Sequence, residues 1–79
     1  MPQLTLYYSD TCPYCQKVLH FMEENRIRFP LKNTATNPAQ RQELLKIGGK
    51  MQVPCLVIDG RALYESEDII VWLENNWKK

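Results

Sequence analysis

The chain has 79 residues, of which 44% are hydrophobic and 24% are charged, and its formal net charge is +1. This near-neutral balance argues against a nucleic acid or an anionic membrane as the main partner, and no apolar run approaches the roughly 20 residues that span a bilayer. The length suits a single small domain, expected over residues 1–79. The N-terminal stretch lacks a basic start followed by a long apolar run, so we expect no signal peptide.

The first half of the chain predicts a strand, a helix and a second strand. Residues 4–8, LTLYY, carry β-branched and aromatic side chains and predict a short strand. After a turn over residues 11–15, Pro13 suits the first position of a helix, and apolar residues then recur at helical spacing until about Asn25. Residues 27–32, IRFPLK, predict a second strand that is irregular or lies at an edge because it contains a proline.

The second half predicts a helix, a β-hairpin and a last helix. An Asn-Pro pair at 37–38 is typical of a helix start, and a Gly-Gly pair at 48–49 is typical of a helix end. Residues 55–59, CLVID, predict a buried strand, and the Asp-Gly pair at 59–60 predicts a tight turn into an antiparallel partner over 61–65. Ser66 opens the last helix. The residues of this helix expected to face the core are Ile69, Ile70, Leu73 and Trp77.

The expected order of elements is therefore β-α-β-α-β-β-α. The β-α-β start implies two parallel strands joined by a right-handed crossover, and the hairpin adds an antiparallel strand. We expect an α/β fold with a four-stranded mixed sheet and three helices.

The motif with the clearest chemistry is SDTCPYCQK, residues 9–17, in which Cys12 and Cys15 are separated by a proline and a tyrosine. The chain has three cysteines, an odd number, whereas small secreted scaffolds usually carry an even set of disulfide-forming cysteines. Three cysteines, two of them in a C-x-x-C pair, favour a reducing compartment and a catalytic role. We therefore expect a cytoplasmic location.

Two other interpretations of the pair are weaker. A structural zinc site needs four ligands, and the chain offers only Cys12, Cys15, Cys55 and His20, without the usual spacing of a second ligand pair. We therefore expect no metal. A purely structural disulfide between Cys12 and Cys15 would close a very short loop and would restrain little of the unfolded chain.

A redox role has a direct physical basis, because the thiolate is the nucleophile in thiol–disulfide exchange. If Pro13 begins the helix, Cys12 precedes the first turn, where unpaired N–H groups and the positive end of the helix dipole favour a thiolate. Cys15 lies one turn further along and faces inward. These positions predict that Cys12 attacks a disulfide and that Cys15 resolves the intermediate.

With these residues the chain resembles the glutaredoxins, a thioredoxin-fold family that uses glutathione as reductant. The tetrapeptide CPYC is the usual active-site sequence of that family, whereas thioredoxins typically carry Gly-Pro between the cysteines. Residues 41–54, RQELLKIGGKMQVP, resemble the second helix and the Thr-Val-Pro segment of glutaredoxins. Residues 60–70, GRALYESEDII, resemble both the glutaredoxin Gly-Gly-Cys-Asp-Asp region and the Glu-Ser element of glutathione transferase N-terminal domains.

The resemblance implies roles for particular residues toward glutathione. Cys12 would be the thiol that becomes glutathionylated, with Cys15 as the resolving thiol. Pro54 matches a cis-proline, which would let the Val53 backbone bind the cysteinyl part of glutathione. The expected contacts with the rest of the tripeptide are Ser66 and Glu67 at the γ-glutamyl carboxylate, Arg41 near the glycyl carboxylate, Tyr14 alongside the tripeptide, and Gln52.

Three positions depart from the glutaredoxin pattern. Ser9 replaces a frequent lysine and is followed by Asp10, so a cation is lost and an acid is added, both of which disfavour a thiolate at Cys12. Gln52 replaces the usual threonine before Val-Pro. Residues 64–66, Tyr-Glu-Ser, replace Gly-Gly-Cys and make this edge more similar to a transferase.

Simpler interpretations exist for several of these residues. Ser66 could be a helix N-cap, with Glu67 favouring the first turn through the helix dipole. Arg41 could be a solvated helix residue, and Tyr14 an exposed aromatic. Cys55 is best interpreted as a buried, unreactive thiol.

The sequence thus favours a monomeric glutathione-dependent thiol–disulfide oxidoreductase that acts on protein disulfides or protein–glutathione mixed disulfides. One alternative is a glutathione-binding module, related to a transferase N-terminal domain, with little reductase turnover. Another is a dimer that holds an iron–sulfur cluster through Cys12 and external glutathione, against which Pro13 argues.

Overall fold

The computed structural model describes residues 3–77, and it confirms the predicted order of helices and strands. The elements are β1 (Leu4–Tyr8), α1 (Pro13–Glu24), β2 (Leu31–Asn33), α2 (Pro38–Gly48), β3 (Cys55–Ile58), β4 (Arg61–Tyr64) and α3 (Ser66–Asn76). The domain expected over 1–79 includes residues 1–2 and 78–79, which lie outside the described residues. Within residues 3–77, no helix has both the length and the apolar character needed to cross a membrane.

The strands form one mixed sheet in the order β2-β1-β3-β4, with β1 parallel to β2 and the other two pairings antiparallel. Tyr7 lies opposite Cys55, and Cys55 lies opposite Tyr64. The end of β1, the start of β3 and the end of β4 therefore meet at one edge of the sheet. This edge brings together the segments that follow β1, precede β3 and follow β4.

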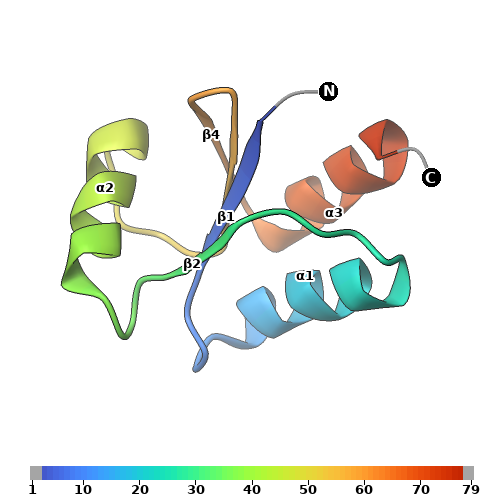
Figure 1. The fold of residues 1–79 in the computed structure, drawn as a ribbon, viewed down its shortest axis with the longest axis horizontal. Coiled ribbons are helices and arrows are strands. Elements are labelled where there is room, and N and C mark those ends of the chain that lie inside the picture. Colours follow the sequence, from blue (N-terminus) through green and yellow to red (C-terminus); the bar gives the residue numbers. More distant parts are fainter. Residues whose placement is uncertain (1–2, 78–79) are drawn as a thin grey trace.

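Helices cover both faces of the sheet, with α1 and α3 together on one side and α2 alone on the other (Figure 1). Because successive strand residues point to opposite faces, β1 contributes Leu6 to one face and Tyr7 to the other. The larger cluster contains Leu4, Leu6, Val18, Met22, Ile27, Leu56, Ile69 and Leu73, with Ile70 and Trp77 packed against it. The smaller cluster, on the side of α2, contains Tyr7, Leu44, Cys55 and Val57.

Local sequence signals explain the ends of α2 and the hairpin. The Asn37 side chain accepts a hydrogen bond from the Ala39 N–H at 3.0 Å and caps the start of α2, as predicted. Gly49 ends α2 in the left-handed conformation, with φ 79°. Asp59 and Gly60 both have positive φ, 49° and 86°, which is the combination that a type I′ hairpin turn requires.

The predicted extent of the second strand is wrong over residues 27–30. The strand begins only at Leu31, which lies opposite Leu6 in the parallel ladder. Ile27 is buried in the core without belonging to the sheet. Pro30 has no N–H to give to a ladder, and only its carbonyl takes part, by accepting a bond from the Leu6 N–H at 3.1 Å.

Candidate active site

Cys12 is the N-cap residue of α1, and Pro13 is the first residue of the helix. The backbone of Cys12 is extended (φ −93°, ψ 116°), and the Cys12 carbonyl accepts the first helical bond from the Gln16 N–H at 3.1 Å. The first N–H groups of a helix lack intrahelical partners, and they lie next to the N-cap residue. Cys12 is partly exposed, and its thiol donates a weak hydrogen bond to the Val53 carbonyl, with 3.8 Å between Sγ and O.

Cys15 has a different environment, although it lies only one helical turn away. Its side chain is fully buried at the start of α1. Burial raises the pKa of the Cys15 thiol to about 12, and the neighbouring Cys12 thiol adds to this increase. A hydrogen bond from the Ser9 N–H to Sγ, at 3.4 Å, acts in the opposite direction. Of the two thiols, Cys12 is therefore the accessible one.

A hollow of about 330 Å³ collects most of the residues expected to bind a tripeptide. It is lined by Tyr14 from α1, by Gln52, Val53 and Pro54 from the segment before β3, and by Glu65, Ser66 and Glu67 from the start of α3. The peptide bond between Val53 and Pro54 is cis, as the resemblance implies. The same Val53 contacts the Cys12 thiol through its carbonyl, so the hollow and the thiol are adjacent.

The start of α3 gives the hollow its polar character. Ser66 is the first helical residue and is buried, whereas Glu65 is the N-cap residue, with φ 75° and no side-chain capping bond. The interpretation of Ser66 as the N-cap is therefore wrong by one position. Unpaired N–H groups at a helix start form a site suited to a carboxylate, and the residue at this helix start, Ser66, carries a hydroxyl and lines the hollow.

Side-chain contacts join the segments around the hollow. Gln52 Nε2 donates to Glu65 Oε1 at 3.2 Å. Lys17 Nζ lies 2.5 Å from Glu67 Oε1 and links α1 to α3. Sequence reasoning did not assign Glu65 or Lys17 to the site. The Glu-Ser pair was an available signal for Glu65, but the pairing of Lys17 with Glu67 depends on how the two helices pack.

The residues that depart from the glutaredoxin pattern are held by local bonds. The Ser9 hydroxyl lies 3.1 Å from that of Thr11, in the turn that precedes Cys12. The Asp10 carboxylate accepts a hydrogen bond from the Asn33 side chain, and the Asp10 carbonyl accepts one from Gln16 at 3.1 Å. These bonds hold the turn that precedes Cys12.

Arg41 and Cys55 lie outside this hollow. Arg41 is exposed on α2 and lines a separate hollow of about 280 Å³ with Pro38, Gln42, Leu45 and Met51. Its contact with a glycyl carboxylate stays a prediction. Cys55 is fully buried, as expected, and burial raises the pKa of its thiol to about 11.

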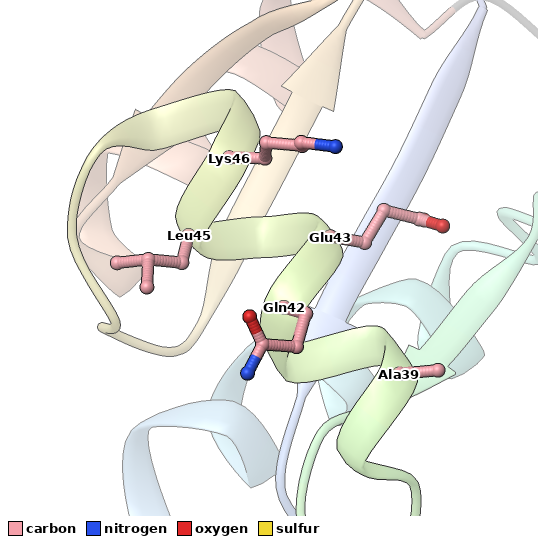
Figure 2. A pocket seen from close by; sticks show the side chains of 5 residues that line it. All are labelled: Ala39, Gln42, Glu43, Leu45 and Lys46. Atoms are coloured by element: carbon pink, nitrogen blue, oxygen red, sulfur yellow. The ribbon is translucent and has the colours of Figure 1, made fainter.

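A further hollow, of about 410 Å³, lies over α2 and is lined by Ala39, Gln42, Glu43, Leu45 and Lys46. Figure 2 shows Leu45 projecting from the helix on the side opposite to Glu43 and Lys46. None of these lining residues is a cysteine. This hollow therefore offers no thiol, whereas the hollow at the edge of the sheet lies beside the Cys12 thiol. Among residues 3–77, no three His, Cys, Asp or Glu side chains converge as a metal-binding group.

Comparison with known proteins gives the family. Residues 11–76 match the family described as "Glutathione S-transferase, N-terminal domain". The chain belongs to this family. The match includes the cysteine pair, the cis-proline segment and the Glu-Ser element, so it spans every part of the candidate site.

Individual relatives show that this transferase-type domain is also similar to glutaredoxins. It is 35% identical over 69 residues to Prostaglandin E synthase 2 of Danio rerio, which covers 87% of this chain but only 18% of that protein. It is 28% identical over 69 residues to Glutaredoxin 3 of Escherichia coli (strain K12), covering 87% of this chain and 83% of the glutaredoxin.

A solved structure supports the same assignment. Glutathione transferase Omega 3C from Trametes versicolor superposes with a TM-score of 0.79 at 34% identity, over 92% of this chain and 33% of that one. The thioredoxin-like fold and the resemblance to glutaredoxins with a transferase-like element are thus confirmed. The chain spans about a fifth of the synthase and about a third of the transferase.

Proposed function

We propose that the domain is a glutathione-dependent thiol–disulfide oxidoreductase. The observation that carries the proposal is the position of the Cys12 thiol, which is partly exposed at a helix start and 3.8 Å from the carbonyl of Val53, a residue that lines the polar hollow. A nucleophilic sulfur beside a hollow with backbone and carboxylate-binding groups suits a peptide that carries its own thiol. Glutathione is such a peptide.

In the proposed reaction, the Cys12 thiolate attacks the glutathione sulfur of a mixed disulfide. The old S–S bond breaks, a new one forms between Cys12 and glutathione, and the substrate thiolate leaves and takes a proton from water. A second glutathione thiolate then attacks the glutathione sulfur bound to Cys12. This step regenerates the Cys12 thiolate and releases oxidised glutathione. One half of that product is the glutathionyl group of the substrate, and the other is the one free glutathione that the cycle consumes.

Cys15 offers a second route, in which it attacks Cys12 and releases glutathione. That route needs the Cys15 thiolate, and burial raises the pKa of Cys15 to about 12. At neutral pH very little of Cys15 is therefore in the thiolate form that this attack needs. We therefore expect free glutathione to resolve most of the intermediate.

The first prediction separates the two cysteines. Cys12→Ser should abolish reduction of a peptide–glutathione mixed disulfide, because no attacking sulfur remains. Cys15→Ser should keep most of the activity, because free glutathione can still resolve the intermediate. The assay contains glutathione, glutathione reductase and NADPH, and Cys55→Ala is the matched control, since it removes a thiol that does not line the hollow. Turnover by Cys12→Ser would overturn the assignment of the nucleophile.

A glutathione-binding module with little turnover is the second candidate, and the family match and the Glu65-Ser66 pair favour it. Titration with S-methylglutathione, which cannot exchange disulfides, measures binding without chemistry. Binding without turnover in the wild-type protein would favour the module over the enzyme. Turnover that depends on Cys12 would favour the enzyme.

The remaining proposals concern the setting of the reaction. We propose protein disulfides or glutathionylated proteins as substrates, a monomer, no resident metal and a cytoplasmic location, for which the three cysteines are the argument. Sedimentation analysis tests the monomer, and subcellular fractionation tests the location. A brown colour in the purified protein would contradict the absence of an iron–sulfur cluster.

A further inference from the structure

Tyr64 is the last residue of β4 and directly precedes the Glu-Ser pair of the hollow. Its hydroxyl donates a hydrogen bond to the Lys50 carbonyl, with 3.0 Å between the oxygens. The ammonium group of Lys50 lies 4.5 Å from the centre of the Tyr64 ring, a cation–π distance. Tyr64 thus binds both the backbone and the side chain of Lys50.

Lys50 belongs to the segment that leads from α2 to the cis-proline, and this segment lines the hollow two residues later. At that point Gln52 Nε2 donates to Glu65 Oε1. Two contacts, Lys50 with Tyr64 and Gln52 with Glu65, therefore join the segment before β3 to the end of β4 and the start of α3. These two segments supply six of the seven residues that line the hollow.

Gly48 provides the space for this arrangement. A Cβ atom at position 48 would lie 1.8 Å from the Tyr64 hydroxyl oxygen and 2.8 Å from Cζ of the ring. Neither distance is possible between non-bonded atoms, so any side chain at position 48 must displace the Tyr64 ring. The glycine at the end of α2 is thus matched to the tyrosine at the end of β4.

We propose that Tyr64 is a positioning residue for the glutathione reaction, which it serves by holding the Val53 segment at a fixed distance from the start of α3. The inference rests on the proposed function. Tyr64 does not line the hollow and acts through Lys50 and Glu65. Without the Tyr64 hydroxyl, the segment over residues 50–53 is less ordered in the free protein. Part of the binding free energy of the ligand then goes into ordering this segment, and the affinity falls.

The test is Tyr64→Phe, which removes one oxygen and keeps the ring. We expect the KM for the glutathione mixed disulfide, and the dissociation constant for S-methylglutathione, to rise about three- to tenfold, the range that one net hydrogen bond supplies. The kcat should stay within about twofold, because the Cys12 position depends on α1. Hydrogen exchange at the amides of residues 51–53 should become faster.

Tyr8→Phe is the matched control, since it removes the same atom from a tyrosine that packs on the α1 and α3 side of the sheet. It should leave the KM and the exchange of residues 51–53 unchanged. If Tyr8→Phe raises the KM as much as Tyr64→Phe does, the effect is general destabilisation, and the proposal is overturned.

Gly48→Ala gives an independent route to the same contact, because it displaces the ring instead of removing the hydroxyl. It should raise the KM at least as much as Tyr64→Phe, and the double variant should show less than the product of the two single effects. Independent, fully multiplicative effects would contradict a shared contact.

The outcomes also distinguish this inference from the proposed function. If the wild-type protein neither binds S-methylglutathione nor reduces the mixed disulfide, the proposed function fails and the inference fails with it. If the wild type does both and Tyr64→Phe is unchanged in KM and in exchange, only the role of Tyr64 is refuted.

Discussion

Cys12 and Cys15 belong to the same helix turn, yet their surroundings give them different chemistry. Cys12 precedes the helix as its N-cap residue and is partly exposed, with its sulfur next to the Val53 carbonyl. Cys15 is fully buried among core residues, and burial raises the pKa of its thiol to about 12. Exposure at the N-cap is what assigns the attack to Cys12 in the proposed mechanism.

The buried thiols predict how stability depends on pH. The pKa of Cys55 rises from an ordinary 9.0 to about 11 in the folded protein, because of burial. Between these two values the folded state keeps a proton that the unfolded state releases, so the free energy of unfolding should fall as pH rises from about 9. The maximum slope is about 1.4 kcal/mol per pH unit for each such group.

Urea unfolding of the reduced protein between pH 8 and 11, with Cys55→Ala for comparison, measures this effect. The range of pH follows from the two pKa values of Cys55. Cys55→Ala should show a shallower fall than the wild type, and Cys15 should account for much of the slope that remains, since the pKa of its thiol is also raised. Equal slopes in wild type and Cys55→Ala would contradict a proton held by burial at Cys55.

At the scale of single elements, local sequence signals decide where helices begin and end. The side chain of Asn37 accepts the Ala39 N–H and satisfies one of the first unpaired donors of α2. Asn37→Ala should therefore lower the free energy of unfolding by about 1 kcal/mol. Asn37→Ser keeps a capping oxygen and should lower it by much less. Equal losses in both variants, measured by urea unfolding, would show that the cap does not stabilise α2.

How much of the fold could be predicted depends on whether a feature is set by adjacent residues or by contacts between distant ones. The start of α1 at Pro13, the cap at Asn37 and the turn at 59–60 each depend on a few adjacent residues, and the structure confirms all three. The extent of β2 depends instead on its register with β1, which is a contact between distant residues. Ile27, which falls in the predicted strand but not in the observed one, packs in the core without forming a strand, and composition alone does not separate these two outcomes.

The candidate site divides in the same way. The cysteine pair and the cis-proline are visible as motifs, and six of the nine predicted residues line one hollow. Cys12 adjoins that hollow at its Val53 side, Cys15 is buried in α1, and Arg41 lines another hollow. The pairing of Lys17 with Glu67 and the contact of Tyr64 with Lys50 join elements far apart in the sequence, so no local pattern could indicate them.

At the scale of the whole molecule, the two faces of the sheet are unequally packed. Helices α1 and α3 lie together on one face and contribute Val18, Met22, Ile69 and Leu73 to its buried cluster. Helix α2 lies alone on the other face, and its one buried residue is Leu44. Little apolar burial means a low local stability, so α2 should open more readily than the rest of the fold.

Native-state hydrogen exchange in low concentrations of urea tests this difference. Amides in the middle of α2 should exchange through an opening that costs less free energy than global unfolding, whereas amides of α1 and α3 near the core should report the global value. Because α2 leads into the segment that Tyr64 holds, S-methylglutathione should slow exchange in α2 as well as at residues 51–53. If amides of α2 and α1 exchange through openings of equal free energy, with and without the ligand, then the two faces of the sheet unfold as a single unit. In that case the stability of α2 alone cannot change the affinity for glutathione.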